Sequence, residues 1–131
     1  MNTILGIDPG LRVTGYGVIH QEKQNFTYES SGTIKTTQQD LDLAERIKII
    51  VTGIDEVIKK FNPSIVAIEK VFVNTNPQST LLLGQARGAA IAAIVSKEIN
   101  IYEYTALQIK KSVVGNGHAD KLQVQTMVQR L

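Results

Sequence analysis

The chain has 131 residues, of which 43% are hydrophobic and 20% charged, and its formal net charge is +2 at pH 7. These values are ordinary for one soluble globular domain, while the absence of cysteine excludes a disulfide framework and a thiolate metal site. The N-terminus has neither a basic leader nor a long apolar segment, and Gln85 and Arg87 interrupt the most apolar stretch, so we expect a cytoplasmic protein without a membrane span.

The first part of the chain predicts three strands. Residues 3–7 form a β-rich run that ends at the turn signal Asp8-Pro9-Gly10, and residues 13–19 and 26–34 have similar strand character. Because only short polar segments join them, these strands should form an antiparallel meander.

A helix should follow, since apolar residues recur at three- and four-residue spacing from Leu43 to Phe61 before Asn62-Pro63 ends the pattern. The continuous apolar run of residues 64–73 is typical of a central strand that is covered on both faces. A crossover through the helix most simply places this strand parallel to the first one.

The remaining segments continue the alternation of helices and strands. Asn76-Pro77 should open a helix that reaches about Lys97, and residues 99–104 should form a fifth strand. A short helix over residues 105–111 and a last helix from about Ala119 complete the pattern. The expected fold is therefore α/β, with a mixed five-stranded sheet and helices on both of its faces.

The last predicted helix shows no terminating signal. Val124, Val128 and Leu131 still mark its apolar face, and no glycine, proline or cap follows them. We therefore expect residues 1–131 to be one domain that is cut inside its last helix.

Two acidic residues are associated with apolar strands. Asp8 lies at the end of the first predicted strand and Glu69 within the fourth. If these strands are parallel neighbours, both carboxylates fall at the same end of the sheet, where ligand sites gather. Carboxylate oxygens suit Mg²⁺ or Mn²⁺, and a pair of such ions would support phosphodiester hydrolysis, although two carboxylates are few ligands for two ions. Alternatively, each acid only accepts hydrogen bonds from nearby backbone amides.

Four segments, GIDPGLRVTGYGVI, AIEKVF, LGQARGAA and VVGNG, closely resemble the RuvC family of Holliday junction resolvases, and the resemblance covers the whole chain. It implies an RNase H-like fold, a homodimer, two divalent metal ions per site, and paired nicks across a four-way DNA junction in recombination and repair. A branch-migration helicase complex is implied as a partner. The first two acids of the family fall on Asp8 and Glu69, and the remaining acids have no counterpart in these residues.

The resemblance also assigns roles to one aromatic and two basic residues. It implies that Phe72 approaches unpaired bases at the junction, where stacking is worth about 1–3 kcal/mol per base. It places Lys110 and Lys121 near the strand that is cut, where they would bind phosphate and support catalysis. The alternatives are a phenylalanine in the core and lysines that are only solvated.

Small residues recur every four positions in the second predicted helix, at Gly84, Gly88, Ala92 and Ser96. Glycine within a helix costs about 1 kcal/mol relative to alanine, so two glycines one turn apart indicate close approach by another element. Packing on the helix's own sheet and contact with a second copy both fit this pattern, and the resemblance favours a two-fold dimer contact.

Two other functions fit parts of the sequence. Nucleotide-binding enzymes of the actin and sugar-kinase type begin with a similar hairpin, but they need two lobes to enclose ATP. A non-catalytic junction-DNA-binding domain would use the same surface without the remaining acids.

Overall fold

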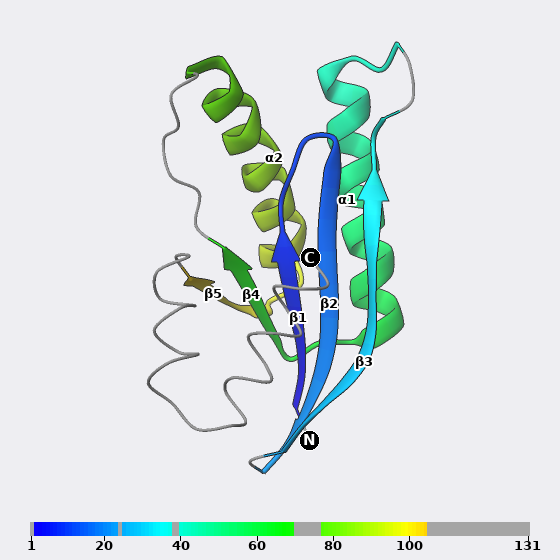
Figure 1. Ribbon diagram of the computed structural model, residues 1–131, viewed down its shortest axis with the longest axis vertical. Helices are drawn as coiled ribbons and strands as arrows, with labels where there is room; N and C mark the ends of the chain where they lie inside the picture. Colours follow the sequence, from blue (N-terminus) through cyan, green and yellow to red (C-terminus); the bar gives the residue numbers. More distant parts are fainter. Residues whose placement is uncertain (1, 24, 38–39, 70–76, 105–131) are drawn as a thin grey trace.

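The computed structural model describes residues 2–23, 25–37, 40–69 and 77–104. Within them, five strands form one mixed sheet in the order β3-β2-β1-β4-β5 (Figure 1). The first three strands are antiparallel neighbours, whereas β4 runs parallel to both β1 and β5. The elements are β1 (Asn2–Asp8), β2 (Val13–Glu22), β3 (Asn25–Lys35), α1 (Leu43–Phe61), β4 (Ile65–Glu69), α2 (Pro77–Val95) and β5 (Asn100–Tyr104).

This order confirms the predicted meander, the crossover and the parallel pairing of the first and fourth strands. The helices that we predict over residues 105–111 and from Ala119 lie outside the described residues. Within the described ranges, no helix is long and apolar enough to cross a membrane.

Helix α1 begins at Leu43, as the apolar spacing predicts, and ends at Phe61, directly before the predicted Asn62-Pro63 signal. The Asp42 side chain accepts a hydrogen bond of 2.8 Å from the backbone N–H of Glu45, which caps the first turn. At the other end, Asn62 adopts a left-handed conformation with φ of 48°, and its N–H donates to the carbonyl of Ile58 over 2.8 Å. Between these caps, Ile50, Ile54 and Ile58 are buried against the sheet.

Both described helices cover the same face of the sheet, where they lie side by side (Figure 1). Successive strand residues point to opposite faces, and the set that faces the helices includes Leu5, Ile7, Val18, Val66 and Ile68. From α2, the residues that meet this core are Ala86, Ala90, Ala93 and Ile94. The opposite face of the sheet also carries buried apolar residues, namely Ile4, Ile19 and Ala67.

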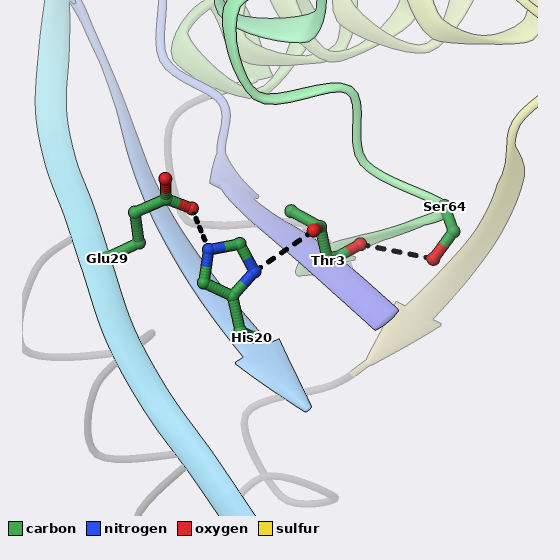
Figure 2. A network of polar contacts seen from close by, with 4 residues as sticks. All are labelled: Thr3, His20, Glu29 and Ser64. Atoms are coloured by element: carbon green, nitrogen blue, oxygen red, sulfur yellow. Dashed lines mark hydrogen bonds and ion pairs between the residues drawn. The ribbon is translucent and has the colours of Figure 1, made fainter. Parts of the chain in front are cut away.

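A polar network joins β1, β2, β3 and the segment before β4 (Figure 2). The Nδ1 atom of His20 lies 3.0 Å from the hydroxyl of Thr3, and its Nε2 atom pairs with Glu29. Glu29 can reach His20 because β3 has an extra residue there: Val18 pairs with Ser30, but Ile19 pairs with Tyr28.

The same network helps to align β4 with β1. The backbone N–H of Ser64 donates to the carbonyl of Thr3 over 2.9 Å, directly before the parallel pairing of Ile4 with Ile65 begins. The network therefore fixes the register of these two strands at their amino ends.

Candidate active site

The two predicted acids lie at the carboxyl ends of neighbouring parallel strands. Asp8 is the last residue of β1 and Glu69 the last residue of β4. The register pairs Ile4 with Ile65 and continues to Ile7 with Ile68, so the next residues, Asp8 and Glu69, come level with each other. Because Ile7 and Ile68 point into the helix-covered core, the two carboxylates project from the opposite face of the sheet.

Burial and mutual repulsion both act on this pair. Each residue is partly buried, and burial raises the pKa of the Asp8 carboxyl because the charged form loses hydration. The pKa of Glu69 is raised chiefly by burial and further by the negative charge of Asp8. Among the described residues, neither carboxylate takes part in an ion pair or a side-chain hydrogen bond that would offset its charge.

The strand beside Asp8 offers backbone rather than side chains. In the register of β1 with β2, Asp8 lies opposite Gly15, and Gly6 lies opposite Gly17. All three glycines are buried, and none can place a side chain next to the carboxylates. The site therefore consists of a pair of acids, and the neighbouring residues of β1 and β2 are glycines that present only backbone to it.

Such a pair fits a hard divalent cation. Carboxylate oxygens are the ligands that Mg²⁺ and Mn²⁺ prefer, and a cation would relieve the repulsion that raises the pKa of Glu69. In the part of the chain that the structure describes, no group of three histidine, cysteine or acidic side chains could share an ion. Asp8 and Glu69 supply two carboxylates that could hold a metal ion at this end of the sheet.

The other predicted site residues separate into two groups. Phe72, Lys110 and Lys121 lie outside the described residues, so their positions stay predictions. Gly84, Gly88 and Ala92 are exposed on α2, and a Cβ atom added at either glycine would meet nothing within 4 Å. The alternative that these small residues pack on the helix's own sheet is therefore wrong, because the face that carries them points away from the sheet.

Two residues that hold the turn after Asp8 were not predicted from the sequence. Thr14 and Thr36 are fully buried and donate hydrogen bonds to carbonyls of this turn. A buried threonine gives no signal that separates it from an ordinary strand residue, because its partner is known only once the chain is folded.

A mixed sheet of this strand order, with two acids level on the central strands β1 and β4, defines an RNase H-like α/β protein. Solved structures agree with this class. The chain is similar to "T. thermophilus RuvC in complex with Holliday junction substrate", with a TM-score of 0.81, 29% identity, and 98% of this chain and 78% of that chain covered. The yeast mitochondrial Holliday junction resolvase Ydc2, at 14% identity and a TM-score of 0.67, shares the fold.

Sequence comparison gives the family. The family described as "Crossover junction endodeoxyribonuclease RuvC" matches residues 4–131. Its curated relatives from Janthinobacterium sp. and Herminiimonas arsenicoxydans are 62% and 61% identical over 128 residues, which cover 98% of this chain and 70% of each relative. The chain belongs to the RuvC family of crossover junction endodeoxyribonucleases, and the nucleotide-binding alternative is rejected.

Proposed function

We propose that this protein cleaves four-way DNA junctions and that Asp8 and Glu69 bind the metal ions that the cleavage requires. The observation that carries the assignment is the level pair of partly buried acids, whose charges no described residue offsets. The relative from T. thermophilus is described in complex with a Holliday junction substrate, which supports a four-way junction as the substrate of this chain.

The chemistry follows from what the two carboxylates can do. Divalent ions, Mg²⁺ or Mn²⁺, would supply activated water and stabilise the leaving oxygen of a phosphodiester. Asp8 and Glu69 would hold these ions, and their rigid strands would keep the oxygen ligands in place without reorganisation. We propose two ions per site, which need further oxygen ligands beyond these two carboxylates.

Three residues outside the described ranges complete the proposal. Phe72 follows Glu69 by three positions, and we assign it to stacking on unpaired bases at the junction. Lys110 and Lys121 would bind backbone phosphates, so junction affinity should fall as salt rises. A branch-migration helicase complex stays a predicted partner, and the cytoplasm stays the predicted location.

We also propose that the exposed face of α2 meets the same face of a second copy. Leu81 and Val95 are 63% and 57% exposed, and the small residues Gly84, Gly88 and Ala92 lie between them. A helix that is apolar toward both its core and solvent is usually covered on both sides. A two-fold dimer would present two sites to a junction, which has two strands to be cut.

The test compares Asp8→Asn and Glu69→Gln with the wild-type full chain on a four-way junction and a linear duplex. With Mg²⁺, both variants should lose junction cleavage, while junction binding in EDTA should stay close to wild type. Glu56→Gln, which changes an exposed acid of α1, serves as the matched control and should cut normally.

Two results would contradict the proposal in different ways. If Asp8→Asn cuts junctions at the wild-type rate, the active site lies elsewhere. If the wild-type full chain binds junctions but cuts none at any Mg²⁺ or Mn²⁺ concentration, the non-catalytic alternative is correct.

A further inference from the structure

The turn that follows Asp8 is held through three successive carbonyls. The hydroxyl of Thr14 donates to the carbonyl of Gly10 over 2.9 Å, and the hydroxyl of Thr36 donates to the carbonyl of Leu11. The backbone N–H of Thr36 donates to the carbonyl of Arg12 over 2.8 Å. Residues 10, 11 and 12 are thereby each tied to a threonine that is fully buried.

The turn also has no spare space at its centre. A Cβ atom at Gly10 would lie 2.2 Å from the carbonyl oxygen of Val13, so only glycine fits there. The N–H of Gly10 donates in addition to the hydroxyl of Thr14 over 3.2 Å. These contacts restrict the conformation of the turn.

Thr36 is held in turn from the first part of α1. The Nη1 atom of Arg46 donates to the carbonyl of Thr36 and lies 3.3 Å from its hydroxyl oxygen. That hydroxyl accepts from Arg46 and donates to the carbonyl of Leu11, which lies closer to it than the carbonyl of Arg12 at 3.4 Å. A chain of hydrogen bonds therefore runs from α1 through the end of β3 to the turn beside Asp8.

Asp8 depends on this arrangement, since no described side chain holds its carboxylate. Its orientation is set by the backbone on either side: the pairing of Asp8 with Gly15 on one side and the turn on the other. Residues outside the ligand shell that orient a ligand commonly change metal affinity or activity by 10–100-fold when they are replaced.

We infer that Thr14, Thr36 and Arg46 are positioning residues for Asp8, which act by fixing the turn rather than by touching metal or DNA. This inference rests on the proposed function of Asp8. It predicts that the hydroxyl of Thr36, more than its volume, determines how well the site binds a divalent ion.

The experiment uses the full chain with Thr36→Val, which keeps the shape but removes the hydroxyl, and Thr36→Ser, which restores it. Mn²⁺ binding without DNA is measured by calorimetry, and single-turnover cleavage of a four-way junction is measured against Mg²⁺. We expect Thr36→Val to lose about 10–100-fold in metal affinity and cleavage rate. Thr36→Ser should recover most of both, while junction affinity in EDTA stays unchanged.

Thr37→Val is the matched control, because Thr37 is exposed, and its replacement should leave metal affinity and cleavage unchanged. If Thr36→Val fails to fold, Arg46→Gln is measured in the same way, since it weakens the same chain of hydrogen bonds from its more accessible end. Folding of every variant is followed by circular dichroism.

The outcomes separate this inference from the proposed function. Wild-type Mn²⁺ affinity and cleavage in Thr36→Val, beside an inactive Asp8→Asn, would overturn the positioning role alone. A Thr36→Ser protein as defective as Thr36→Val would also overturn it, because the hydroxyl would then not matter. Normal cleavage by Asp8→Asn would overturn the proposed function and this inference together.

Discussion

At the scale of single residues, the site keeps two acids in a place that disfavours their charge. Burial raises the pKa of both carboxyls, and Asp8 raises the pKa of Glu69 further. An acid whose pKa is higher in the folded state than in the unfolded state destabilises the fold once it is ionised. The pair therefore costs stability, which is consistent with retention for function.

This cost predicts that Asp8→Asn raises the melting temperature in metal-free buffer at pH 7. Below the unfolded-state pKa, about 4, Asp8 is protonated in both states, and the wild type carries no penalty. As the pH rises through the higher folded-state value, the wild type loses stability relative to the variant. Differential scanning calorimetry from pH 4 to pH 8 should show a difference that grows and then levels off.

Mg²⁺ should reverse this order, because an ion that binds the folded wild type stabilises it by mass action. Glu56→Gln provides the control and should show no such dependence on metal. A melting temperature of Asp8→Asn below the wild type at pH 7 without metal would show that Asp8 has a stabilising partner.

At the scale of elements, the two helices relate to the sheet in different ways. Helix α1 is amphipathic and capped at both ends, and Gly53 brings it close to β3. Helix α2 meets the core through alanines and leaves its glycines exposed. The glycine of α1 thus allows close packing against β3, whereas the glycines of α2 lie on an exposed surface.

Gly53→Ala should destabilise the protein although alanine is the better helix former. A Cβ atom at Gly53 would lie 2.8–2.9 Å from three atoms of the Ile34 side chain, so Ile34 would have to shift. Overpacking typically costs about 1–3 kcal/mol, and helix propensity returns about 1 kcal/mol, which leaves a loss of up to about 2 kcal/mol.

Urea denaturation gives the free energy of unfolding for this comparison. Thr52→Ala, at the adjacent exposed position of α1, is the control and should be neutral or gain a few tenths of a kcal/mol from propensity. A Gly53→Ala protein more stable than Thr52→Ala would mean that α1 and β3 have room to move apart.

At the scale of the whole molecule, the sheet separates the proposed active site from the proposed dimer surface. The carboxylates project from the face opposite to α1 and α2, whereas the exposed small-residue face of α2 lies on the helix side. A dimer built through α2 would therefore leave both pairs of acids uncovered by the described helices.

Gly88→Leu should convert the proposed dimer into a folded monomer. Leucine fits the monomer, since a Cβ atom at Gly88 meets nothing within 4 Å, but it would hold two α2 helices apart. Sedimentation velocity should show the change, and the variant should make single rather than paired nicks. Ala44→Leu on the exposed side of α1 is the control and should stay dimeric. A dimeric Gly88→Leu protein would place the interface elsewhere.

The sequence by itself determined the elements and the position of each acid within them. Apolar runs located the five strands and apolar periodicity located α1, while the local signals Asn62-Pro63 and Asn76-Pro77 marked the end of α1 and the start of α2. These features can be predicted because each depends on residues that are close to one another in the sequence. The parallel placement of β4 beside β1, which brings Asp8 and Glu69 to the same end of the sheet, also followed, since a crossover helix leaves few ways to place β4.

Only the tertiary structure decided which residues support the site and which surface is free. Thr36 meets Leu11 across 25 positions of sequence, and no local pattern specifies such a partner. Likewise, α2 carries apolar or small residues at most positions, interrupted by Gln85 and Arg87, so its sequence could not say which face would be covered. The answer came from the core, where Ala86 and Ala90 pack inward and turn Gly84 and Gly88 toward solvent. Local preferences allow several ways to pack the same elements, and contacts between distant segments form only in the one that the folded chain adopts.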